Sequence, residues 1–336
     1  VTVPFSVTDL QHLSETEQTG ALKAWEEEEK QRDFDYSIAP ILRVNVFIRG
    51  EEDFRVTFCF HHAILDGWSL SSMLSELFSL LCDGGAAEEK PPLVTTFRDF
   101  IALEQQSLES QEARDYWAKK LADLRVTALP PSEGPAARES ARNVEEVRFD
   151  SKLVEGLKSF ARLAGVSLKS VLLAAHCRVL GLLSGQSEVT SGLVSNGRPE
   201  EADGDRALGL FLNTIPFSLN LKDATWLDLA QSAAEAEREL GPHRRYPLPE
   251  LQKANGGEPL FEATFNYTHF HILEPVREAP NFKITEPESF SNINYPFSAG
   301  FDLNNNSELI LILENDSTRL STQQIDQIRN YYSRAL

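Results

Sequence analysis

The sequence predicts an α/β fold of the α+β sandwich type, because both halves of the chain mix strands with amphipathic helices. Apolar and polar residues alternate over 54–60, which is typical of a strand with one buried face. Over 70–81 apolar residues recur at the spacing of one helix face. A stretch rich in Pro, Ser and Ala at 129–143 has no sustained apolar period and predicts a linker between two lobes, 1–128 and 144–336.

The N-terminal lobe is expected to contain a helix, two strands and two further helices. Ser14 and Glu17 have the spacing of a capping box, which opens the first helix. The acidic run from Glu26 to Glu29 is interpreted as a solvated face of that helix. Ser69 is expected to cap the helix that follows the second strand. The expected ranges are a helix at 13–32, strands at 41–48 and 54–60, and helices at 69–81 and 97–120.

The C-terminal lobe is expected to mix strands and helices in a second sandwich. Its helices are predicted at 151–164, 167–183, 226–240 and 321–335, and its strands at 147–150, 188–195, 211–221, 262–268 and 308–314. This order favours sheets covered by helices in both lobes. The sequence contains no short-period repeat, so any similarity between the lobes is architectural.

The charge balance excludes several classes of partner. Lys and Arg number 32 and Asp and Glu number 51, a formal net charge of −19 that repels phosphate backbones and anionic lipid surfaces. We therefore expect no nucleic-acid partner and no membrane partner. The three cysteines, Cys59, Cys82 and Cys177, form neither a disulfide framework nor a zinc motif, which indicates a reducing, cytoplasmic compartment.

The segment His-His-Ala-Ile-Leu-Asp-Gly at 61–67 carries the clearest chemical signal. A buried strand delivers two imidazoles at its end, and Asp-Gly then turns the chain into a helix, so these side chains are placed to line a cleft. Histidine moves protons near neutral pH, and a carboxylate four residues later fixes the loop or the ring. Adjacent strand residues face opposite sides, so only one of His61 and His62 is expected to enter the cleft.

Other histidines and the neighbouring serine are interpreted as structural. A strand-end or core histidine is more often a satisfied structural residue than a catalyst. We apply this interpretation to His12, His176, His243, His269 and His271. No metal is expected, because adjacent histidines diverge and no third ligand lies near them. Ser69 lacks the G-x-S-x-G context of a nucleophile.

The segment at 61–69 resembles the HHxxxDGWS signature of condensation domains from nonribosomal peptide synthetases, within the chloramphenicol-acetyltransferase-like superfamily. Further segments resemble family blocks in the same order along essentially the whole chain. They are Phe-Arg-Asp-Phe at 97–100, Ser-Asn-Gly-Arg-Pro at 195–199, Leu-Gly-Leu-Phe-Leu-Asn-Thr at 208–214, His-Arg-Arg-Tyr-Pro-Leu at 243–248, and Phe-Asn-Tyr at 265–267.

The resemblance implies a fold and a reaction. Two chloramphenicol-acetyltransferase-like lobes would form a V-shaped pseudo-dimer around a central tunnel. The implied reaction is amide formation between a donor acyl or peptidyl thioester and an acceptor aminoacyl thioester. Both substrates would be held on 4'-phosphopantetheine arms of donor and acceptor peptidyl carrier proteins, and the domain itself would bind no cofactor. An adjacent adenylation domain of a multidomain synthetase is a further implied partner.

The resemblance also implies residue roles. His62 would take a proton from the amine or hydrogen-bond the tetrahedral intermediate, while His61 and Asp66 would hold the turn. Gly67 would leave room for the pantetheine arm. The candidates for lining the tunnel or contacting substrate are Trp68, Ser69, Asn213 and Asn266. For the two asparagines, ordinary strand-end hydrogen bonding is an equal alternative.

Departures from the family pattern lead to two further expectations. The first two family blocks have no match, so we expect the chain to be N-terminally incomplete and to require that segment as a partner. The arginine that pairs with the signature aspartate belongs to the second block, and Arg43 and Arg55 are not obvious substitutes as partners of Asp66. Two alternative functions stay open: a non-catalytic module that recruits carrier or tailoring proteins, and a related CoA-type acyltransferase. Retention of His62 favours the enzyme.

Overall fold

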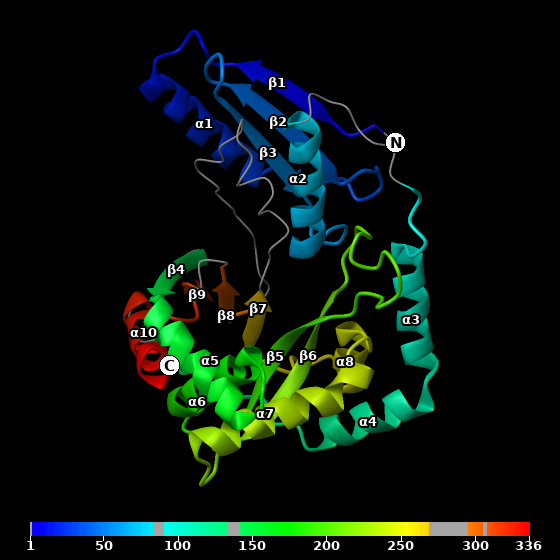
Figure 1. Ribbon diagram of the computed structural model, residues 1–336, viewed down its shortest axis with the longest axis vertical. Helices are drawn as coiled ribbons and strands as arrows, with labels where there is room; N and C mark the ends of the chain where they lie inside the picture. The colour runs from blue at the N-terminus through cyan, green and yellow to red at the C-terminus, as the bar shows by residue number, and fades with distance from the viewer. Residues whose placement is uncertain (1, 83–90, 133–141, 269–294, 305–307) are drawn as a thin grey trace. The chain divides into compact units, whose positions relative to one another are not determined.

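The computed structural model describes residues 2–82, 91–132, 142–268, 295–304 and 308–336 (Figure 1). The chain forms two compact units by its contacts. The first is Val1–Leu70 with Leu208–Leu210, and the second is Ser71–Ala207 with Phe211–Leu336. Each unit combines a sheet with helices, which confirms the predicted α/β class.

The first unit is built on a three-stranded sheet in the order β1-β2-β3. β1 (Phe5–Asp9) runs parallel to β2 (Leu42–Ile48), which runs antiparallel to β3 (Phe54–Phe60). The two predicted strands are confirmed, whereas β1 was not predicted. All five of its residues are exposed, so this edge strand has no buried face to mark it in the sequence.

Helix α1 (Glu15–Lys30) covers one face of that sheet through a small apolar core. Leu10, Leu22 and Phe47 are buried, and the ring of Trp25 meets the ring of Phe47 edge-on with centroids 4.9 Å apart. The predicted capping box is present: the Ser14 amide donates to the Glu17 carboxylate at 2.8 Å.

Ion pairs add to this apolar contact, and they correct the interpretation of the acidic run. Glu29 accepts from the Arg43 guanidinium at 2.6 Å, and Glu26 accepts from Arg55 at 2.5 Å. Glu29 is 9% exposed at its side chain. Two of the four glutamates therefore bind α1 to the sheet, because helical spacing turns them inward while Glu27 and Glu28 face solvent.

The second unit contains a six-stranded mixed sheet in the order β4-β9-β8-β7-β5-β6. The β5–β7 and β7–β8 pairs are parallel and the other pairs are antiparallel. The strands are β4 (Arg142–Phe149), β5 (Glu188–Asn196), β6 (Leu212–Asn220), β7 (Ala263–Thr268), β8 (Phe297–Leu303) and β9 (Leu309–Asp316).

Most of the described helices belong to this second unit. They are α3 (Phe97–Glu109), α4 (Gln111–Ala122), α5 (Ser151–Ala164), α6 (Leu168–Ser184), α7 (Trp226–Leu240), the 3-10 turn η1 (Gly241–His243), α8 (Leu248–Ala254) and α10 (Thr322–Ala335). Helix α2 (Gly67–Cys82) begins in the first unit and continues into the second. Among the described residues no single helix is long and apolar enough to cross a membrane; α5 and α6 pass only as a pair bent by 100°.

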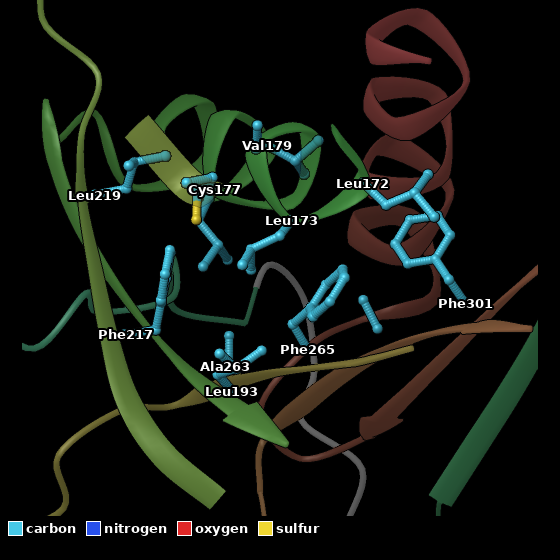
Figure 2. Close-up of a cluster of buried hydrophobic side chains, with 14 of the residues drawn as sticks. Leu172, Leu173, Cys177, Val179, Leu193, Phe217, Leu219, Ala263, Phe265 and Phe301 are labelled. Atoms are coloured by element: carbon cyan, nitrogen blue, oxygen red, sulfur yellow. The ribbon is translucent and has the colours of Figure 1, made fainter. Parts of the chain in front are cut away.

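The core of the second unit lies between α6 and the sheet (Figure 2). Leu173 and Cys177 of α6 and Phe265 of β7 have no exposed surface. Helix α6 is apolar on several sides because neighbouring elements cover it, including α5, α7 and α10. Trp117 of α4 joins the same core at 2% exposure, so α4 packs within the second unit although it precedes the expected linker. The lobes 1–128 and 144–336 stay a prediction, and residues 133–141 of the linker lie outside the described residues.

Three details differ from the sequence prediction. The single helix expected at 97–120 is two helices, because Ser110 adopts an extended conformation and its hydroxyl caps α4 by accepting from the Ala113 amide at 3.2 Å. Strand β4 begins at Arg142, within the expected linker. Strand β8 was not predicted, since Ser298, Ala299 and Gly300 dilute its apolar pattern.

Candidate functional site

The histidine pair lies on a tight turn between β3 and α2. The His61 amide donates to the Ile41 carbonyl at 3.1 Å, which continues the pairing of β2 with β3, and the Ile64 amide returns to the His61 carbonyl at 3.2 Å. The chain then enters α2 at Gly67. We call residues 60–70 the histidine turn.

Asp66 forms the N-cap of α2, so the expected cap at Ser69 is wrong. The Ser69 amide donates to the Asp66 carboxylate at 2.7 Å, and the Leu70 amide donates to the Asp66 carbonyl at 2.9 Å. This is the hydrogen-bonding pattern of a helix N-cap three residues before the donor amide. Asp66 is 1% exposed, and its carboxylate orders the turn from inside.

The His61 ring is held on two sides. Its Nδ1 accepts a hydrogen bond from the Ala63 amide at 3.1 Å, which in the neutral ring leaves the proton on Nε2. The ring of Tyr36 meets the imidazole edge-on, with centroids 5.1 Å apart and planes inclined at 82°. This geometry suits the turn-holding role that the resemblance implied for His61.

His62 differs from His61 in its surroundings. Its side chain is exposed, while His61 is half-buried, as expected for adjacent residues at a strand end. The ring of Phe60 is tilted against the His62 ring at a centroid distance of 6.3 Å. In the part of the chain that the structure describes, no side chain or backbone group hydrogen-bonds the His62 ring.

A distant segment completes the histidine turn. The Gly209 carbonyl accepts from the Asp66 amide at 2.9 Å and from the Ser69 hydroxyl at 2.9 Å, and the Gly209 amide donates back to the Ser69 hydroxyl at 3.1 Å. Sequence reasoning noted the surrounding block at 208–214 but had no signal for this contact. Gly67 and Trp68, the first two residues of α2, are half-buried beside it.

The two asparagine candidates lie in the second unit. The Asn213 amide group donates to the carbonyls of Arg244 at 3.0 Å and Tyr246 at 2.7 Å, and its oxygen accepts from the Leu248 amide at 3.3 Å. These bonds join β6 to the start of α8, so they match the structural alternative for Asn213. Asn266 is half-buried on β7 in register with Gly300 of β8.

Cys59, Cys177 and His243 are placed as structural groups, whereas His12 is exposed. Burial, followed by the nearby Glu29 carboxylate, raises the pKa of Cys59 to about 11, and burial also raises the pKa of Cys177. Such thiols stay protonated near neutral pH. The His243 ring stacks on Tyr116 at 3.9 Å. His269 and His271 lie outside the described residues, among which no group of three or more His, Cys, Asp or Glu side chains could hold a metal.

Comparison with known proteins identifies the family of this fold and turn. The family model of the condensation domain matches residues 1–334. The chain therefore belongs to the condensation-domain family, which confirms the resemblance found in the sequence.

Its relatives are large synthetases. The chain is similar to the AMB antimetabolite synthetase AmbE of Pseudomonas aeruginosa, 38% identical over 255 residues, which cover 74% of this chain and 12% of that protein. It is also similar to gramicidin S synthase 2 of Brevibacillus brevis, 27% identical over 259 residues, which cover 74% of this chain and 6% of that protein. The chain thus spans only a small part of the length of these relatives.

Solved structures share the fold. The condensation domain from the Monacolin K polyketide synthase MokA superposes with a TM-score of 0.79 at 18% identity, covering 98% of this chain and 78% of that one. The X-domain from teicoplanin biosynthesis gives a TM-score of 0.81 at 19% identity, covering 100% and 78%. These likenesses extend the agreement in fold class to solved structures.

Proposed function

We propose that this condensation domain forms an amide bond between a donor acyl or peptidyl thioester and the α-amine of an acceptor aminoacyl thioester. The observation that carries the proposal is the exposed His62 ring on a turn that buried groups hold rigidly. Rigid placement of an accessible imidazole is what proton transfer and transition-state hydrogen bonding require. The synthetase names of the relatives point to the same chemistry.

The proposed reaction needs little activation of its nucleophile. The acceptor amine attacks the thioester carbonyl, a C–N bond forms, the C–S bond breaks, and the amine proton leaves with the carrier thiol. A free α-amine has a pKa near ~8, so a useful fraction is neutral at cellular pH. His62 would therefore act by orienting the amine and by holding a proton between the amine and the departing sulfur.

We infer that carrier proteins present both substrates on phosphopantetheine arms, and that an adenylation domain works beside them. A four-domain nonribosomal peptide synthetase is among the proteins with this fold, at a TM-score of 0.77. Contributions of Gly67, Trp68 and Asn266 to substrate binding and a cytoplasmic location belong to the same proposal.

The competing function is a recruitment module without catalysis. Fold likeness does not separate the two, because the X-domain of teicoplanin biosynthesis, also solved as a complex with OxyB, is as similar as the condensation domains. His62 is the distinguishing residue, because recruitment has no need for an exposed imidazole at the end of β3.

The test is an amide-formation assay of the protein that contains this chain, with donor and acceptor carrier proteins loaded. We expect His62→Ala to lower the rate about 100-fold or more, the lower end for general acid–base catalysis. His12→Ala is the matched control, since His12 is an exposed histidine of the same unit outside the turn. An unchanged rate in His62→Ala removes the residue from the mechanism, and wild-type protein that binds carriers without forming amide supports the recruitment module.

A further inference from the structure

The Ser69 hydroxyl and the Gly209 backbone form a closed pair of hydrogen bonds across 140 residues of sequence. The hydroxyl donates to the Gly209 carbonyl at 2.9 Å and accepts from the Gly209 amide at 3.1 Å. Ser69 has no exposed surface, and Gly209 is also buried. One small side chain thus satisfies both polar groups of a buried residue, which water does not reach.

The same residues are tied to the cap of α2. The Gly209 carbonyl also accepts from the Asp66 amide, and the Asp66 carboxylate accepts from the Ser69 amide. Asp66, Ser69 and Gly209 therefore form a ring of four hydrogen bonds. His62 lies four residues before Asp66 on the same tight turn. If these hydrogen bonds are lost, the backbone that carries the His62 imidazole therefore becomes more mobile.

Gly209 is presented by a tethered segment. Its flanking residues Ala207 and Phe211 are both buried, and Arg198 fixes both. The Arg198 guanidinium donates to the Ala207 carbonyl and to the Gly204 carbonyl, the latter at 3.0 Å, and its Cζ lies 4.0 Å from the centre of the Phe211 ring. Only three residues lie between these two anchored positions, so the segment that carries Gly209 is short.

We propose that Ser69 is a positioning residue for amide formation, which acts by binding Gly209 and thereby fixing the turn that carries His62. This inference rests on the proposed function. It replaces the substrate-contacting role expected for Ser69, because a hydroxyl with no exposed surface and both hydrogen-bonding functions engaged by Gly209 does not reach a substrate. Loss of the hydroxyl therefore changes the reaction step and leaves substrate binding intact.

The test compares Ser69→Ala, Ser69→Thr and Ser69→Cys with the control Ser71→Ala. Ser71 is a buried serine two residues further along α2, and no hydrogen bond joins it to Gly209 in the described structure. Two quantities are measured: kcat and KM for amide formation with loaded carriers, and the rate of amide hydrogen exchange at Gly209. The second readout does not depend on catalysis.

We expect Ser69→Ala to lower kcat at least 10-fold with KM within twofold, and to speed exchange at Gly209 at least 10-fold. Ser69→Thr keeps the hydroxyl and should recover most of both, Ser69→Cys should fall between, and Ser71→Ala should change neither. If Ser69→Ala does not fold, the cysteine and threonine variants carry the comparison.

Two outcomes would overturn the inference. An unchanged kcat in Ser69→Ala means that the turn does not need Gly209, and a raised KM with unchanged kcat means that Ser69 serves substrate binding. Absence of amide formation by the wild-type protein would overturn the proposed function instead. In that case exchange at Gly209 still reports whether Ser69 holds the segment.

Discussion

His62 in the first unit and His176 in the second unit have opposite environments. His176 has no exposed surface, and its Nδ1 lies 2.6 Å from the Tyr332 hydroxyl and its Nε2 2.8 Å from the Ser191 hydroxyl. Because Ser191 donates to the Ala263 carbonyl at 3.1 Å, the consistent proton order puts the His176 proton on Nε2 and makes Tyr332 the donor to Nδ1. Both nitrogens of His176 are hydrogen-bonded inside the core, whereas no described group hydrogen-bonds the exposed His62 ring.

The two histidines show that the same side chain can either stabilise the core or stay accessible, depending on which groups around it form the hydrogen bonds. Around His62, the groups that do the holding belong to the backbone, to Asp66 and to Ser69, so the imidazole itself stays accessible. Around His176, the imidazole does the holding. Burial lowers the pKa of His176 to about 3, which keeps it neutral at physiological pH.

The largest expected effect is the loss of unfolding free energy when His176, rather than His62, is replaced by alanine. His176→Ala leaves the buried hydroxyls of Tyr332 and Ser191 without their partner and opens a cavity, so we expect unfolding free energy to fall by about 3 kcal/mol. His62→Ala should change it by less than about 0.5 kcal/mol, since the side chain is exposed. Urea unfolding followed by circular dichroism measures both. Comparable losses of unfolding free energy from the two substitutions would mean that His176 contributes no more to stability than the exposed His62.

Sequence alone could predict much of the histidine turn. The strand, the two imidazoles and the aspartate are contiguous, so local pattern was sufficient to single them out. The N-cap was predicted at Ser69, and local pattern could not reveal the error, because Asp66, three positions earlier, is of a residue type that caps helices equally well. Only the Ser69 amide, bonded to Asp66, identifies the cap.

Other parts of the fold were beyond local pattern for a different reason. The Gly209 contact joins residues 140 positions apart, and no periodicity encodes a tertiary hydrogen bond. Strand β1 is exposed on both faces, so it carries no burial signal. The interpretation of His176 as structural is confirmed, although its partners Tyr332 and Ser191 became visible only in the structure.

The next effect concerns the cap that holds the histidine turn. Asp66→Ala removes the acceptor of the Ser69 amide, so we expect a loss of about 1.5 kcal/mol of stability, with lower solubility accompanying any loss of activity. Asp66→Asn retains a capping oxygen and should lose less than half as much. Chemical denaturation of both variants measures the difference. A soluble Asp66→Ala variant with full stability and no activity would instead assign Asp66 a direct part in the reaction.

The third prediction concerns the pH dependence of the unfolding free energy, to which the buried His176 contributes. The pKa of His176 is about 3 in the folded chain and near ~6.5 when unfolded, so between these values only the unfolded state gains the proton. Stability therefore falls as pH falls below about 6.5, by about 1.4 kcal/mol per pH unit. Between pH 7.5 and 5.5 this group should remove about 1.4 kcal/mol in total, because the fall begins only near the unfolded pKa.

The control for the titration is His176→Gln, which cannot titrate in this range. Unfolding free energies at the two pH values should differ by about 1.4 kcal/mol less in this variant than in the wild type. Equal pH dependence in both proteins would mean that His176 titrates normally in the folded chain, against its complete burial.

The smallest expected effect comes from removing the aromatic contact between Tyr36 and His61. Tyr36 is 70% exposed, yet its ring meets the His61 imidazole edge-on at 5.1 Å. Tyr36→Ala should lower stability by about 0.5 kcal/mol, the low end for an aromatic pair, because solvent reaches most of the ring. The backbone bond from Ala63 to His61 remains, so amide formation should stay within about threefold of the wild-type rate. A fall in the rate of amide formation well beyond threefold, with stability lowered only by the expected amount, would mean that the Tyr36 ring also sets the position of His62, together with the backbone and Ser69.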